Sequence, residues 1–217
     1  MDWSEVWSLL IPAAILLLYR HQPPVNKPVY SYIITALIIN ITVNLIWKFR
    51  LIEYNGQVYN GFLYNVHAIV RFLLFDLYFR KLRIAHFYKI RHSLRPLFIA
   101  FVVINFTFYE KFYDYHTPFS SRLLSVEALG LLFLCMQFYI SRLSMEEETN
   151  IKQPEVWIVT GLSIYVTINF FIFLLYDKLS QQSARFAVDL WNVHNISYII
   201  LNLFIAKAFY ESGKHRY

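Results

Sequence analysis

Residues 29–47 read VYSYIITALIINITVNLIW, a stretch without a charged side chain that is long enough to cross a bilayer as one helix. Six further apolar stretches along the chain are bounded by charged residues and prolines. Together they predict an all-α, polytopic membrane bundle of seven transmembrane helices that forms one domain over residues 1–217. The segments are residues 6–19, 29–47, 59–79, 97–109, 123–140, 156–176 and 188–209.

The overall composition agrees with this class. Hydrophobic residues make up 58% of the chain and charged residues 16%, and the mean hydropathy is +0.42. Soluble domains average roughly 45–50% apolar and roughly 25% charged residues. Seven helices of about 20 residues take up about 140 residues, which leaves no room for a soluble catalytic domain. The net charge of +6 fits attraction to membrane lipids, and we expect no nucleic-acid partner.

The charges of the connecting segments predict an orientation. If the connections alternate between two sides, one side collects twelve Lys and Arg residues and the other six. The positive-inside rule then places the N-terminus outside and the C-terminus in the cytoplasm. We expect a multi-pass protein of the bacterial inner (cytoplasmic) membrane. Its longest cytoplasmic connection, residues 80–95, is basic and either contacts lipid headgroups or docks a signalling partner.

A short motif occurs twice. Tyr64-Asn65-Val66-His67 in the third segment matches Trp191-Asn192-Val193-His194 in the seventh, at an offset of 127 residues. This predicts a parallel 3+1+3 repeat, with halves at residues 1–82 and 120–210 and a linker helix at residues 95–112. Chance similarity between apolar segments is the alternative. A true repeat would bring the two histidines toward one pseudo-symmetric centre.

Polar side chains inside the predicted helices concentrate in the half nearer the outside. Because buried polar groups are costly in hydrocarbon, this asymmetry indicates a polar cavity that opens outward and is sealed toward the cytoplasm. Tyr64, His67 and Arg71 are three and four residues apart and share one helix face. The candidate ligand-binding residues are Asn65, His67, Arg71, Glu127, Asn169, Asn192, His194 and Asn195.

Two interpretations of these residues remain open. Arg71 and Glu127 either form a structural ion pair, or Arg71 anchors an anionic ligand group while Glu127 holds it in the empty site. His67 and His194 are interhelical hydrogen-bond partners, proton-sensing groups or, with Glu127, zinc ligands. A signature such as HExxH is missing, and the lone Cys135 cannot form a thiolate cluster. We therefore expect neither a metal nor a cofactor.

The last third of the chain carries a family resemblance. The Glu127 segment, residues 153–158 (QPEVWI), Tyr165 and residues 190–196 (LWNVHNI) through Asn202 resemble small bacterial seven-helix membrane proteins. Those proteins are similar to the membrane input modules of sensor histidine kinases, or they stand alone beside signalling genes. The resemblance covers roughly residues 120–210. It implies a sensory or regulatory role and assigns no ligand residues.

The leading hypothesis is a membrane sensor or regulatory module. A small ligand or protons would bind in the outward-facing cavity, and the change would reach a cytoplasmic or membrane partner. The alternative is a small proton-coupled transporter or pore, and a second alternative is an intramembrane metal-dependent lipid hydrolase. Walker loops, GxSxG and CxxC motifs are missing from the sequence, so we do not expect an enzyme.

Overall fold

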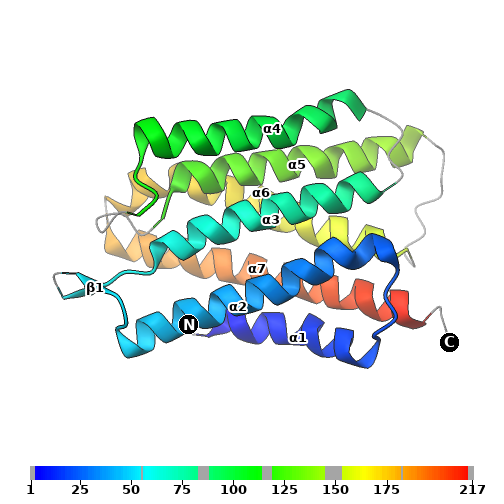
Figure 1. Ribbon diagram of the computed structural model, residues 1–217, viewed down its shortest axis with the longest axis horizontal. Coiled ribbons are helices and arrows are strands. Elements are labelled where there is room, and N and C mark those ends of the chain that lie inside the picture. The colour runs from blue at the N-terminus through cyan, green and yellow to red at the C-terminus, as the bar shows by residue number, and fades with distance from the viewer. Residues whose placement is uncertain are drawn as a thin grey trace.

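The computed structural model describes residues 3–54, 56–82, 88–113, 119–144, 153–181 and 183–214. These described residues form seven long α-helices that lie side by side as one bundle (Figure 1), which confirms the predicted all-α helical fold. The helices are α1 (Ser4–Leu18), α2 (Lys27–Phe49), α3 (Gly61–Lys81), α4 (Tyr88–Ile104), α5 (Ser121–Ser144), α6 (Pro154–Ser180) and α7 (Ala184–Lys214).

Local signals explain several helix ends. Helices α2 and α6 both have a proline in their first turn. Proline suits this position because the backbone N–H groups of the first turn have no partner within the helix, so its missing N–H group costs no hydrogen bond. The 3₁₀ turn η1 (Pro24–Asn26) precedes α2. Helix α2 ends where Arg50 adopts the left-handed conformation at φ 50°. A short hairpin of β1 (Glu53–Tyr54) and β2 (Gln57–Val58) then joins α2 to α3.

Within the described ranges, five helical segments are long and apolar enough to cross a membrane, which indicates a membrane protein. They are Pro24–Phe49, Gly61–Lys81, His92–Tyr109, Ser121–Ser144 and Pro154–Ser180. The remaining apolar helix, α1, has only 15 residues. Helix α7 is longer but more polar, since it directs buried side chains such as His194, Asn195 and Asn202 into the bundle. The sidedness and the seven-span topology stay predictions.

Six helices form a closed ring around the core. Helix α1 packs on α2, α2 on α3, α3 on α5, α5 on α6, α6 on α7, and α7 on α1. Helix α4 lies at the edge of this ring and contacts the bundle mainly along α5 (Figure 1). The order is therefore three ring helices, one outer helix and three more ring helices. It has the arrangement expected of a 3+1+3 chain, although internal symmetry between the halves remains a prediction.

The connection predicted at residues 80–95 is shorter in the structure. Arg80 and Lys81 belong to the last turn of α3, and α4 already begins at Tyr88. At its other end α4 continues into the π-helical turn η2 (Asn105–Tyr109), so the linker helix predicted at residues 95–112 begins earlier, at Tyr88, and ends earlier, at Tyr109. Helix α4 is therefore longer than the predicted fourth segment, because it also includes the basic residues that precede that segment.

Helices α6 and α7 approach each other closely at Gly161. A Cβ atom added to Gly161 would lie 2.5 Å from Phe204 Cβ, so the glycine allows the two helices to approach closely. Small residues have this role in membrane bundles, where packing rather than water exclusion holds helices together. The contact fixes the position of α7 relative to α6.

We predict that Gly161→Ala destabilises the bundle by about 1–3 kcal/mol, because the added methyl group pushes Phe204 and α7 away from α6. Unfolding of the purified protein in mixed micelles measures the change. Ala14→Val, which adds atoms at an exposed position of α1, is the control and should leave stability nearly unchanged. An unaffected Gly161→Ala variant would contradict the tight α6–α7 contact.

Candidate functional site

A bidentate ion pair lies inside the helix ring. Arg71 on α3 contacts Glu127 on α5 through Nε–Oε1 at 2.5 Å and Nη2–Oε2 at 2.7 Å. The Arg71 side chain is 5% exposed and that of Glu127 is fully buried. The guanidinium also lies over the ring of Tyr165 on α6, 4.9 Å from its centroid. Three helices therefore meet at one cation, and both charges are compensated where solvent cannot screen them.

His67 lies one helical turn from Arg71 and is buried between two tyrosine rings. Its ring stacks on Tyr32 at 6.0 Å and meets the edge of Tyr198 at 6.2 Å, while the two tyrosine hydroxyl groups are 3.3 Å apart. The His67 Nε2 atom is buried and has no hydrogen-bond partner among the described residues. An unpaired buried nitrogen is costly, so this atom is a natural contact for water or a ligand.

His194 is held by a different set of partners. Its Nδ1 atom is 2.5 Å from Asn169 Oδ1, and Asn169 Nδ2 donates to the Tyr165 carbonyl at 2.7 Å and to Ser197 Oγ at 2.8 Å. Because Nδ2 is the donor in both contacts, Asn169 Oδ1 accepts a hydrogen bond from the His194 Nδ1–H group. The histidine ring is thus fixed in orientation and lies 4.9 Å from the Trp191 ring.

Two neighbouring cavities that share lining residues lie at this centre. The inner void has a volume of about 10 Å³, which is about the space of one water molecule. The vestibule outside it has a volume of about 230 Å³. The inner void is lined by Glu5, Tyr64, His67, Arg71, Leu124, Trp191, His194 and Tyr198. The vestibule is lined by Trp3, Ser4, Glu5, Val43, Asn44, Trp47, Asn60, Tyr64, Trp191 and Asn195.

Glu5, Tyr64 and Trp191 line both cavities and so form the boundary between them. The expected polar cavity therefore has two parts, and only the vestibule is large enough for a molecule bigger than water. Glu5 makes no hydrogen bond or ion pair through its carboxylate with the described residues. This carboxylate can therefore contact a polar ligand in the vestibule.

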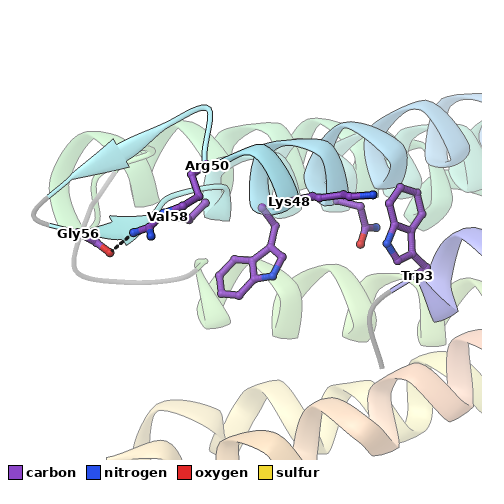
Figure 2. Close-up of a pocket in the computed structure, with 7 residues that line it drawn as sticks. Trp3, Lys48, Arg50, Gly56 and Val58 are labelled. Atoms are coloured by element: carbon purple, nitrogen blue, oxygen red, sulfur yellow. Dashed lines mark hydrogen bonds between the residues drawn. The ribbon is translucent and has the colours of Figure 1, made fainter.

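A wider outer pocket of about 860 Å³ adjoins the vestibule (Figure 2). The two share Trp3, Asn44 and Trp47, and the outer pocket adds Lys48 together with residues of the hairpin. Figure 2 shows Arg50 directed to the hairpin, where Nη2 donates to the Gly56 carbonyl at 2.9 Å. Gly56 has a φ of 80°, a conformation that favours glycine in this turn. The vestibule therefore opens toward the end of the bundle that carries the N-terminus of α1.

At the end of the bundle opposite the vestibule, packed and paired side chains fill much of the ring among the described residues. Asp76 is fully buried and accepts from Arg80 Nε at 2.8 Å, and Arg95 on α4 contacts the same carboxylate. Nearby, Asn202 on α7 donates to Ser8 Oγ on α1 at 2.9 Å. Large buried side chains fill the same end of the bundle, among them Phe75, Tyr78, Phe79, Leu131 and Leu134.

The eight predicted ligand-binding residues separate into three groups. His67, Arg71 and His194 line the inner void, and Asn195 lines the vestibule. Glu127 and Asn169 lie behind them and orient Arg71 and His194. The remaining two, Asn65 and Asn192, line neither cavity.

Asn65 has a structural contact instead. Its Oδ1 atom accepts from the Ser120 backbone N–H at 2.9 Å, and its Nδ2 atom donates to the Phe112 carbonyl at 3.4 Å. It thereby ties α3 to the segments that flank residues 114–118, which lie outside the described residues. Asn192 is half-buried on α7.

Several residues of the site fall outside the predicted set, notably Glu5, Tyr165 and Tyr198. The position of Glu5 near the predicted outer mouth allows it to join the two histidines as a carboxylate, but an acid directly before an apolar segment is also an ordinary helix-start residue. Tyrosines in apolar segments resemble core or interface residues. Within the described ranges, no three His, Cys, Asp or Glu side chains are grouped so that they could hold a metal ion, and Glu127 faces Arg71.

Comparison with protein-family models, with curated proteins and with solved structures gives no match. The resemblance to membrane input modules of sensor kinases therefore rests on the sequence motifs alone.

A double-mutant cycle tests the ion pair. We predict that Arg71→Met and Glu127→Leu each cost about 3–5 kcal/mol of unfolding free energy, because each leaves one buried charge unpaired. The double variant should cost clearly less than the sum, since it removes both charges. Unfolding in mixed micelles measures the coupling. Additive effects would show that the two side chains do not interact.

Proposed function

We propose that this protein is an integral-membrane sensor or regulatory module. In this proposal a small polar ligand or protons enter from the side of the α1 N-terminus and act on the buried polar centre. The change reaches the opposite end of the bundle, where a cytoplasmic or membrane signalling partner would respond. We place it in a bacterial inner membrane, with its N-terminus outside.

One observation carries this proposal. The vestibule and the inner void share Glu5, Tyr64 and Trp191, so an occupant of the outer cavity touches the walls of the inner one. The inner void in turn contacts Arg71, the residue that joins α3, α5 and α6. A ligand at the outer end can therefore bias the packing of most of the ring. Such a bias requires that the ligand bind two helix arrangements with unequal affinity.

Helices α1 and α7 provide the route to the other end. They meet at the cavities through Glu5, Trp191 and Asn195, and further along through the bond between Asn202 and Ser8. Beyond α1, Gln22 Nε2 donates to the Phe209 carbonyl at 3.0 Å. Asn26 Nδ2 likewise donates to Ser212 Oγ at 3.0 Å. Because these bonds tie both ends of α1 to one continuous α7, the two helices would move as a unit.

The transporter alternative has less support. Transport requires a second opening toward the C-terminal end, and there the ring is filled by large buried side chains and by the contacts of Asp76. The hydrolase alternative would need an activated water. Among the described residues His67 and His194 lack a third metal-binding partner, and Glu127 is engaged by Arg71. The sensor proposal needs neither a second opening nor a third metal ligand.

We predict that a reporter at the inner end responds to the outer cavity. A fluorophore on Lys214→Cys, in a Cys135→Ser background, reports on the inner end of α7 in sealed vesicles with trapped pyranine. Lowering the external pH from about 8 to about 4 crosses the ordinary titration ranges of imidazole and carboxylate groups. The reporter should change while pyranine does not. The charged and titratable groups around the void are Glu5, Tyr32, Tyr64, His67, Arg71, Glu127, Tyr165, His194 and Tyr198.

Three variants make this test specific. Glu5→Gln should abolish the reporter change, and Lys178→Gln, an exposed charge on α6 outside the cavities, should retain it. Glu127→Gln should shift the reporter without a pH change, because it frees Arg71. Pyranine acidification that depends on Glu127 would favour a transporter. A reporter unmoved by both pH and Glu127→Gln would contradict the sensor proposal.

A further inference from the structure

A groove separates α1 and α2 at the end of the bundle opposite the vestibule. It has a volume of about 590 Å³. Apolar side chains line most of its length, and two cations, Arg20 and Lys27, stand at one end of it together with Gln22. The lining residues are Ala13, Leu16, Leu17, Arg20, Gln22, Lys27, Tyr30, Ile34, Leu37 and Ile38.

At this end of the bundle α1 packs against α7, and this leaves the groove between α1 and α2. The ring of Tyr19 lies against the backbone of Gly213, where an added Cβ would be 2.5 Å from Tyr19 Cδ1. Tyr19 also meets Tyr210 edge-on at 5.6 Å. These contacts hold the end of α1 on α7, and the small side chain of Ala13 leaves space on its α2 side. The groove is therefore built by close packing elsewhere in the bundle.

The apolar part of the groove faces outward from the bundle. Leu17 is 69% exposed and Ile38 is 60% exposed, and Ile34 between them is also exposed. In a membrane such side chains face acyl chains. Tyr30 is exposed as well and lies three residues after Lys27, at the level where tyrosines mark the membrane interface.

The two cations are exposed and uncompensated. Neither Arg20 nor Lys27 makes an ion pair or a side-chain hydrogen bond with any residue in the described ranges. The described lining contains no acidic residue. Gln22, by contrast, is fixed by its bonds to the Tyr19 and Phe209 carbonyls. Two free positive charges at the end of an apolar groove match a molecule with an anionic head and a hydrocarbon tail.

We propose that this groove binds one anionic phospholipid. The phosphate lies between Arg20 and Lys27, and an acyl chain lies along Leu17, Ile34 and Ile38. A zwitterionic lipid would bring its own cation to the two basic residues, and an apolar peptide would leave them unpaired. With the predicted orientation this end faces the cytoplasmic leaflet, where anionic lipids are enriched. The proposal does not depend on the sensor function, because the groove shares no residue with the vestibule or the inner void.

Native mass spectrometry of the full chain, titrated with phosphatidylglycerol, tests this proposal. We expect one tightly retained phosphatidylglycerol. Arg20→Gln combined with Lys27→Gln should weaken its binding roughly thirty-fold, or roughly fivefold per cation near an anionic group. Phosphatidylcholine with the same acyl chains should bind much more weakly. Soluble glycerol phosphate should not compete, since it lacks the chain that fills the groove.

Two further variants separate charge from shape. The matched control is Lys178→Gln with Arg185→Gln, which removes two exposed cations at the other end of the bundle and should leave binding unchanged. Ile34→Trp, which fills the groove from its exposed side, should weaken binding although both cations remain. Thermal unfolding in phosphatidylcholine verifies that each variant is folded. Equal retention by the wild type and the Arg20/Lys27 double variant, or equal binding of the two lipids, would overturn the proposal.

Discussion

The buried ion pair between Arg71 and Glu127 is the constraint around which the bundle is arranged. Two charges can remain in hydrocarbon only when each satisfies the other, so α3 and α5 must stay in register at this level. The ring of Tyr165 extends the same constraint to α6. The polar centre then has a cation whose position is fixed, and His67 and His194 lie on the side of that cation toward the vestibule. Any molecule that changes the pair changes three helices at once.

The two ends of the ring differ in chemistry for a physical reason. At the outer end, tryptophans and asparagines leave room between α1, α2, α3 and α7, and the resulting vestibule reaches the polar centre. At the inner end, aromatic and aliphatic side chains fill the ring and Asp76 is neutralised by arginines from α3 and α4. This asymmetry supports the proposed sensor, which needs a cavity open to one side only. It gives less support to a transporter, which needs openings at both ends of the bundle.

Much of the fold was predictable because apolar stretches long enough to span a bilayer admit few structures. The free-energy cost of unpaired polar groups in hydrocarbon explains the seven helices and the pairing of Arg71 with Glu127. The spacing of polar residues along each helix places His67 and His194 inside the bundle. The extent of α4 was not predictable from the sequence, because its first turns are rich in basic residues and resemble a loop. The role of Asn65 in holding a connecting segment, and that of Glu5 as a cavity wall, depend on contacts between distant segments. Spacing within one helix carries no information about such contacts.

The central claim is that the polar centre is reached from the α1 N-terminal end alone. The most direct measurement is the sidedness of thiol labelling in sealed vesicles. Asn195→Cys and Asn202→Cys are placed separately in a Cys135→Ser background and treated with a small, charged, membrane-impermeant methanethiosulfonate. The cysteine at 195, in the vestibule wall, should react only from the side of the N-terminus, and the one at 202 from neither side. Labelling at 195 from the opposite side, or at 202 from either side, would contradict the account.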